Sequence, residues 1–101
     1  MIFNNRCALI TGAAAGIGLA TARTLAAHGV RLVLTDVNSD GLDKAVAELR
    51  ESGADAVGFV LDVSSDEDVD RLAAGLEEND IKIDILINNA GIWRDNTGNF
   101  W

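Results

Sequence analysis

Cysteine, histidine and long apolar runs are scarce in this chain of 101 residues. Because Cys7 is the single cysteine and His28 the single histidine, these side chains can form neither an internal disulfide nor a zinc site. We expect no metal centre, and the carboxylates leave only a weak magnesium site open. No apolar run reaches the about 18 residues of a transmembrane helix. The first ten residues also lack the pattern of a secretory signal, so we expect a cytoplasmic protein without membrane insertion.

Acidic residues are absent from residues 1–35, although the whole chain has a formal net charge of −8. Nearly all of them lie between Asp36 and Asp84. Such a chain lacks the basic face that binds a phosphate backbone, so nucleic acid is not an expected partner. The first segment would tolerate a small anionic ligand best, and most of the later acids are expected on the solvated faces of helices.

Proline is absent, and strand patterns alternate with helix patterns along the chain. Continuous runs of apolar residues predict strands that are covered on both faces, at Cys7–Thr11, Arg31–Thr35, Ala56–Leu61 and Ile83–Asn88. Linkers of about two to six residues predict parallel strands with right-handed crossovers. The expected fold is a Rossmann-type doubly wound α/β sheet, truncated after about four strands in the order 3-2-1-4. Residues 1–101 would form one such half-domain, with an irregular tail over 92–101.

The intervening segments have helical length and period. The first helix, 16–28, is predicted to end before Gly29, and the second, 40–52, to end before Gly53. In the third, Ser64 is expected to cap the helix while Glu67 reaches back to it. The apolar positions of the first two helices are predicted to face the core. They are Ile17, Ala20, Thr24 and Leu25 in the first helix, and Leu42, Ala45, Val46 and Leu49 in the second.

Glycines crowd the junction between the first strand and the first helix, in the stretch TGAAAGIG. Gly12 would turn the chain sharply, Gly16 would begin the helix, and Gly18 would let the helix pack closely. A turn without side chains lets a phosphate reach the N–H groups of the first helical turn. Asp36, at the end of the second strand, can accept hydrogen bonds from the ribose hydroxyls of an adenosine and would repel a 2′-phosphate.

Together with LDV at 61–63 and NNAG at 88–91, this stretch resembles the short-chain dehydrogenase/reductase family over essentially the whole chain. The tail GIWRDN more weakly resembles the 3-oxoacyl-[acyl-carrier-protein] reductase branch. The resemblance implies binding of NAD(H) or NADP(H) and hydride transfer between nicotinamide and an alcohol or carbonyl. Ala15 and Val37 stand where NADP-dependent members often carry a basic residue, which favours NAD.

The resemblance also implies individual roles. Asp36 would hold the adenosine ribose, Asp62 would accept from the adenine amino group, and Val63 would pack against the ring. Asn88 is expected to be structural. The pyrophosphate would be cradled by Gly12, Ala14, Ala15, Gly16, Ile17 and Gly18, and the ribose beside nicotinamide would be lined by Asn89, Ala90 and Gly91.

The catalytic half of the family's site is missing from this sequence. Family members use a tyrosine as general acid/base, a lysine four residues later and a serine, whereas this chain contains no tyrosine. Lys44 and Lys82 fall at positions that cannot match that motif. No catalytic residue is therefore predicted, and the chain alone is expected to be inactive.

Several alternatives remain at the level of sequence. The chain would be a fragment or a frameshifted product of an NAD-dependent enzyme, a free-standing nucleotide-binding module, or a structural protein that keeps the sheet. An S-adenosylmethionine site shares the glycine turn and the acids but fits the spacing poorly. Because the fourth strand would be an edge with an uncovered apolar face, self-association or a covering partner is expected.

Overall fold

A computed structural model describes residues 5–89 of the chain. Four parallel strands alternate with three helices in this part of the chain. The strands are β1 (Cys7–Thr11), β2 (Arg31–Asp36), β3 (Ala56–Val60) and β4 (Ile85–Ile87). The helices are α1 (Gly16–Ala27), α2 (Ser39–Glu51) and α3 (Asp66–Glu78). Among them, no helix is long and apolar enough to cross a bilayer.

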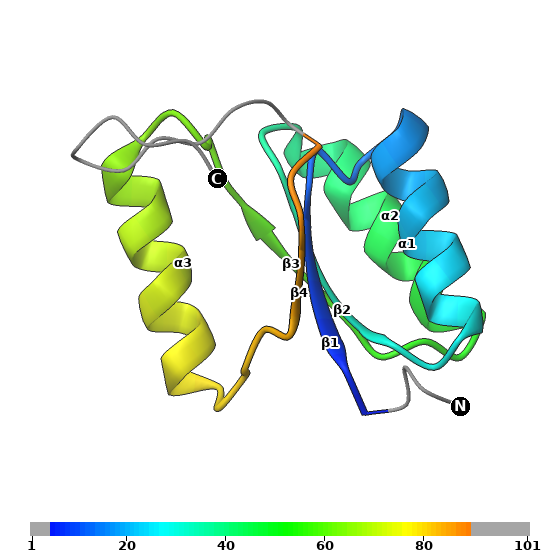
Figure 1. The fold of residues 1–101 in the computed structure, drawn as a ribbon. Helices are drawn as coiled ribbons and strands as arrows, with labels where there is room; N and C mark the ends of the chain where they lie inside the picture. Colours follow the sequence, from blue (N-terminus) through cyan, green and yellow to red (C-terminus); the bar gives the residue numbers. More distant parts are fainter. Residues whose placement is uncertain (1–4, 90–101) are drawn as a thin grey trace.

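The sheet has the order β3-β2-β1-β4, which confirms the predicted topology. Ile10 pairs with Leu34 of β2 on one side and with Ile87 of β4 on the other, so β1 lies at the centre. Helices α1 and α2 lie together on one face of the sheet, and α3 lies on the other face (Figure 1). The chain reverses its order of strands beside β1, which is where ligands bind in folds of this kind.

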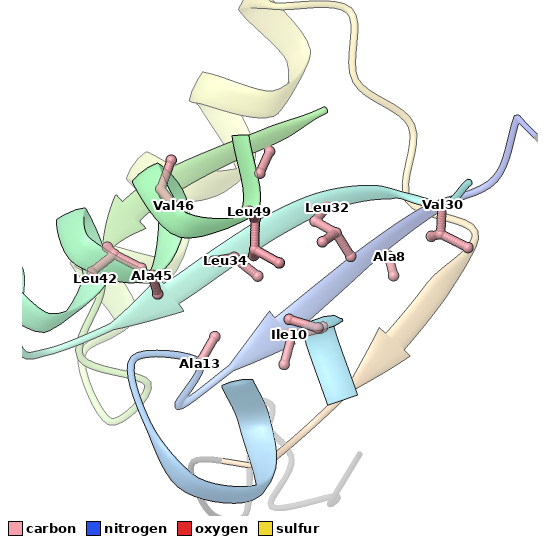
Figure 2. Close-up of a cluster of buried hydrophobic side chains, with 12 residues drawn as sticks. Ala8, Ile10, Ala13, Val30, Leu32, Leu34, Leu42, Ala45, Val46 and Leu49 are labelled. Carbon is pink, nitrogen blue, oxygen red and sulfur yellow. The ribbon is translucent and has the colours of Figure 1, made fainter. Parts of the chain in front are cut away.

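The larger core lies between the sheet and the pair α1 and α2 (Figure 2). Ile10 and Leu34 point from the sheet into this layer, and Leu42 and Leu49 meet them from α2. The apolar face predicted for α2 is confirmed, because all four of its core positions are buried. A smaller core on the opposite face is built around Cys7, Leu9, Val33, Leu61 and Leu72.

The predicted core face of α1 is wrong at three of its four positions. Ile17 is 77% exposed, and Ala20 and Thr24 are exposed as well. The helix instead buries Gly18 and Ala22, with Leu25 packed partly against the core. Because α1 is rich in alanine and glycine, its apolar residues are spread around the helix, and the close approach of Gly18 to its neighbours decides which face turns inward.

The predicted cap of α3 is displaced by one residue. Ser65, not Ser64, is the N-cap, and its hydroxyl oxygen accepts from the Asp68 N–H at 3.2 Å. The Ser64 hydroxyl instead donates to Asp62 at 2.6 Å. The carboxylate that reaches back is that of Asp68, not Glu67, and it accepts from the Asp62 N–H at 3.0 Å instead of from the capping serine. Ser64 and Ser65 are each followed three residues later by an acid, so the sequence pattern fits either as the cap. Because the Ser64 hydroxyl donates to the Asp62 carboxylate, Ser65 caps the helix.

Strand β4 is shorter than predicted and lies at one edge of the described sheet. Its start is fixed to β1 by a reciprocal pair, in which the Cys7 N–H donates to the Asp84 carboxylate and the Asp84 N–H donates to the Cys7 carbonyl, both at 2.9 Å. Leu86 on β4 is 38% exposed. An apolar groove of about 230 Å³ lies beside it against α3.

Candidate functional site

The turn between β1 and α1 uses backbone conformations that favour glycine. Gly12 has φ 62° and Gly16 has φ 59°, which are left-handed conformations that side chains disfavour. Between them, the Ala13 N–H donates to the Thr35 carbonyl of β2 at 3.0 Å. The turn is therefore fastened to the neighbouring strand while it reverses the direction of the chain.

Gly18 lies against this turn with no room for a side chain. A Cβ at Gly18 would come within 2.2 Å of the Gly12 carbonyl oxygen and 2.9 Å of the Asn89 amide nitrogen. The same Asn89 amide donates to the Gly12 carbonyl at 3.2 Å. Gly12, Gly18 and Asn89 thus form one close contact among the end of β1, the start of α1 and the end of β4.

The start of α1 has no side-chain cap, unlike the starts of α2 and α3. Its N-cap, Ala15, offers no oxygen, and no acidic residue lies in its first turn. By contrast, Asn38 caps α2 and Ser65 caps α3, and both helices have acids in their first turn. An uncapped helix start presents N–H donors and positive dipole charge, which together favour an anion.

Asp36 stands at the end of β2 beside the glycine turn and is partly buried. One carboxylate oxygen accepts from the Ala14 N–H at 2.9 Å, and the other accepts from the Asn38 N–H at 2.9 Å. Each oxygen has a further lone pair for a ligand hydroxyl. The carboxylate is therefore held in position by the backbone and can still accept hydrogen bonds.

A crevice of about 160 Å³ opens at the ends of these strands. Asp36, at the end of β2, and Asp62, in the loop after β3, both line it together with apolar side chains. Asp62 belongs to the loop between β3 and α3, where Ser64 donates to its Oδ1 through both the hydroxyl, at 2.6 Å, and the backbone N–H, at 2.9 Å. These bonds, the hydroxyl bond first, hold the pKa of the Asp62 carboxyl below its usual range. The lining residues are Gly12, Asp36, Val37, Leu61, Asp62 and Val63.

Thr11 connects the end of β4 to this site and was not among the predicted site residues. Its buried hydroxyl donates to the Asn88 side-chain oxygen at 3.1 Å and accepts from the Asn89 N–H at 2.9 Å. The structural role expected for Asn88 agrees with this contact. A buried threonine at the end of a central strand was the available signal, because a buried hydroxyl needs partners.

The residues present fit a bound diphosphate. An ideal Cβ built on Gly16 would meet no atom within 4 Å, so the space above the start of α1 is open.

His28 lies at the opposite end of α1. Within residues 5–89 there is no group of three or more histidine, cysteine or acidic side chains that could hold a metal ion. Ala90, Gly91 and the predicted tail 92–101 lie outside the described residues.

The sequence model of a family described as short chain dehydrogenase matches residues 6–100. An oxidoreductase of Bacillus subtilis (strain 168) is 43% identical over 88 residues, which are 87% of this chain and 32% of that protein. Reductases of 3-oxoacyl-[acyl-carrier-protein] are also among the similar proteins, together with a hydroxysteroid dehydrogenase. The expected resemblance is confirmed, and it extends to relatives with several different substrates.

Solved structures give the same result. Xylitol dehydrogenase bound to NAD⁺ is 43% identical, with a TM-score of 0.82 over 90% of this chain and 35% of that one. The actinorhodin polyketide ketoreductase with NADPH is 41% identical, with a TM-score of 0.80 over 85% of this chain and 33% of that one. The chain thus spans about one third of the length of the proteins that it matches.

Proposed function

Because the chain belongs to the short-chain dehydrogenase family, we propose that it binds a nicotinamide dinucleotide at the crevice beside the glycine turn. The observation that carries the proposal is the start of α1, which is uncapped, reached over a turn without side chains and placed next to the anchored carboxylate of Asp36. Diphosphate and ribose are the two groups that such a pair of features recognises.

Each part of the ligand has candidate partners in the chain. Asp36 would accept from the adenosine ribose, and Asp62 would accept from the adenine amino group while Val63 packs against the ring. Their positions around one crevice support these roles. Asn89 would contribute to the ribose beside nicotinamide with Ala90 and Gly91. The diphosphate would be held by backbone groups of Gly12, Ala14, Ala15, Gly16, Ile17 and Gly18.

The proposed cofactor is NAD and not NADP. A carboxylate at Asp36 would repel a 2′-phosphate, and neither Ala15 nor Val37 offers a positive charge to compensate. Solved relatives include complexes with NAD⁺ and with NADPH, so the preference depends on these side chains and not on family membership.

When bound, the nicotinamide ring would accept or donate a hydride. The chain's part in that chemistry is to bind and orient the dinucleotide, because it contains no tyrosine to exchange a proton with an alcohol or carbonyl. We therefore assign oxidoreduction of such a substrate to a complete enzyme of this family and expect no turnover from this chain alone. A cytoplasmic location is part of the proposal.

Self-association or a partner over β4 also belongs to the proposal. The exposed Leu86 and the apolar groove beside it support this expectation, because soluble proteins rarely leave such a surface uncovered beside a strand edge. Light scattering over a range of protein concentrations tests it, and a strictly monomeric chain at high concentration would contradict self-association.

Calorimetry with NAD, NADP and S-adenosylmethionine tests the cofactor assignment. NAD should bind, NADP should bind more weakly, and S-adenosylmethionine should give no heat. Replacing Asp36 with alanine should weaken NAD binding more than NADP binding. If neither dinucleotide gives heat or a thermal shift at millimolar concentration, the chain is a structural module and the proposed function is wrong.

A further inference from the structure

We propose that Ser64 is a positioning residue that gives the crevice its preference for an amino-bearing purine, by holding Asp62 so that one carboxylate oxygen stays available. The inference rests on the proposed dinucleotide function and concerns how the base is selected. Ser64 itself does not line the crevice, whereas Asp62 does.

Two donors from Ser64 converge on the same oxygen. The hydroxyl lies 2.6 Å and the backbone N–H 2.9 Å from Asp62 Oδ1. No donor from residues 5–89 reaches Oδ2. A carboxylate fixed in this way has one oxygen engaged internally and one oxygen that can accept from a ligand.

The backbone of Asp62 is fixed independently of its side chain. Its N–H donates to Asp68 Oδ2 at 3.0 Å, and Arg71 pairs with the other oxygen of Asp68. Asp68 is itself bound at its N–H by the Ser65 cap of α3. The main chain at Asp62 is therefore anchored to the first turn of α3, and the two bonds from Ser64 act on the orientation of the carboxylate.

An ionised acceptor distinguishes purines by their six-position. Adenine carries an amino group there, which donates to a carboxylate, whereas hypoxanthine carries a carbonyl, which repels it. Removing the Ser64 hydroxyl would leave only the backbone N–H bond at Asp62 Oδ1, so the carboxylate would be held less firmly. It would also raise the pKa of the carboxyl, because the hydroxyl bond is the largest cause of its lowering.

The test compares NAD with nicotinamide hypoxanthine dinucleotide, measured by calorimetry on the full chain. For the unaltered chain, NAD should bind more tightly than the hypoxanthine analogue. In Ser64→Ala, NAD affinity should fall by about threefold to tenfold, the range expected for one lost positioning hydrogen bond. Affinity for the analogue should change little, so the preference should shrink. Ser64→Thr retains a hydroxyl and should keep the preference for NAD over the analogue.

Acidification provides a second readout that a merely structural role would not move. Because the ionised carboxylate is the acceptor, NAD binding should weaken as pH falls through the pKa of Asp62. In Ser64→Ala this weakening should begin at a higher pH than in the unaltered chain. Ser52→Ala, which removes a hydroxyl at the far end of α2, is the matched control and should alter neither readout.

The outcomes separate the two proposals. If the unaltered chain binds neither dinucleotide, the proposed function fails. If it binds NAD but Ser64→Ala keeps the same preference between the two purines and the same pH profile, the function stands and the role of Ser64 is wrong.

Discussion

Asp36 holds the glycine turn from the neighbouring strand, because its Oδ2 accepts from the Ala14 N–H at 2.9 Å while its Oδ1 accepts from the Asn38 N–H. The carboxylate that is proposed to hold the ribose therefore also shapes the loop proposed to hold the diphosphate. Loss of this side chain should affect the protein even without a nucleotide.

Asp36→Ala is expected to lower the free energy of unfolding of the nucleotide-free chain by about 1–3 kcal/mol, because two backbone N–H groups lose their acceptor. Thermal or urea unfolding measures this loss. Asp43→Ala, an exposed change on α2, is the control and should be nearly neutral. Equal stability of the two variants would show that Asp36 serves only the ligand.

Gly18→Ala should destabilise the chain by about 1–3 kcal/mol, because its Cβ would lie 2.2 Å from the Gly12 carbonyl oxygen. The displaced turn should also lose dinucleotide affinity, which calorimetry measures. Gly75→Ala is the matched control inside α3, where the new Cβ meets only the ring edge of Phe59 at 3.1 Å. There the gain in helix propensity, about 1 kcal/mol, offsets the crowding. Similar losses in both variants would contradict the close contact at Gly18.

Thr11→Val keeps the shape of the side chain but removes its hydroxyl, which is buried and joins β1 to Asn88 and Asn89. The variant should lose about 1–3 kcal/mol of stability, since the Asn88 side-chain oxygen and the Asn89 N–H both lose their bond to the buried Thr11 hydroxyl. Hydrogen exchange at residues 85–89 should accelerate. Thr24→Val is the control, because the exposed Thr24 hydroxyl donates only to the Ala20 carbonyl within α1, and it should change neither stability nor exchange. Unchanged exchange in Thr11→Val would mean that other contacts hold the end of β4.

Glu48 makes a two-pronged ion pair with Arg23 between α2 and α1, with both contacts at 2.7 Å. The hydrogen bond to Arg23 lowers the pKa of the Glu48 carboxyl from its ordinary value of 4.5. A lowered folded pKa contributes stability above 4.5, and this contribution is lost as pH falls through the folded value. In Glu48→Gln the loss of stability on acidification should be shallower. Identical acid profiles would show that this exposed pair, like many surface ion pairs, contributes nothing measurable to the free energy of unfolding.

The alternation of apolar runs and helical periods was sufficient to predict the strand order and the confirmed core face of α2. It failed in α1, where Ile17 points outward, because alanine and glycine give no clear apolar stripe. The glycine positions followed from the chemistry of a tight turn. The contact of Asp36 with Ala14 and the partners of Thr11 could not be predicted, since they depend on how segments distant in sequence align. The bond of Ser64 could not be predicted either, because its hydroxyl could have capped α3 but donates to the Asp62 carboxylate.

Titration of the isotopically labelled chain with NAD, followed by amide NMR, tests the central claim most directly. The account predicts that the largest shifts occur at residues 13–18, 36–38 and 62–64, around one crevice, and that they saturate together. Shifts that are absent at millimolar NAD, or that appear instead along the groove between α3 and β4, would contradict it.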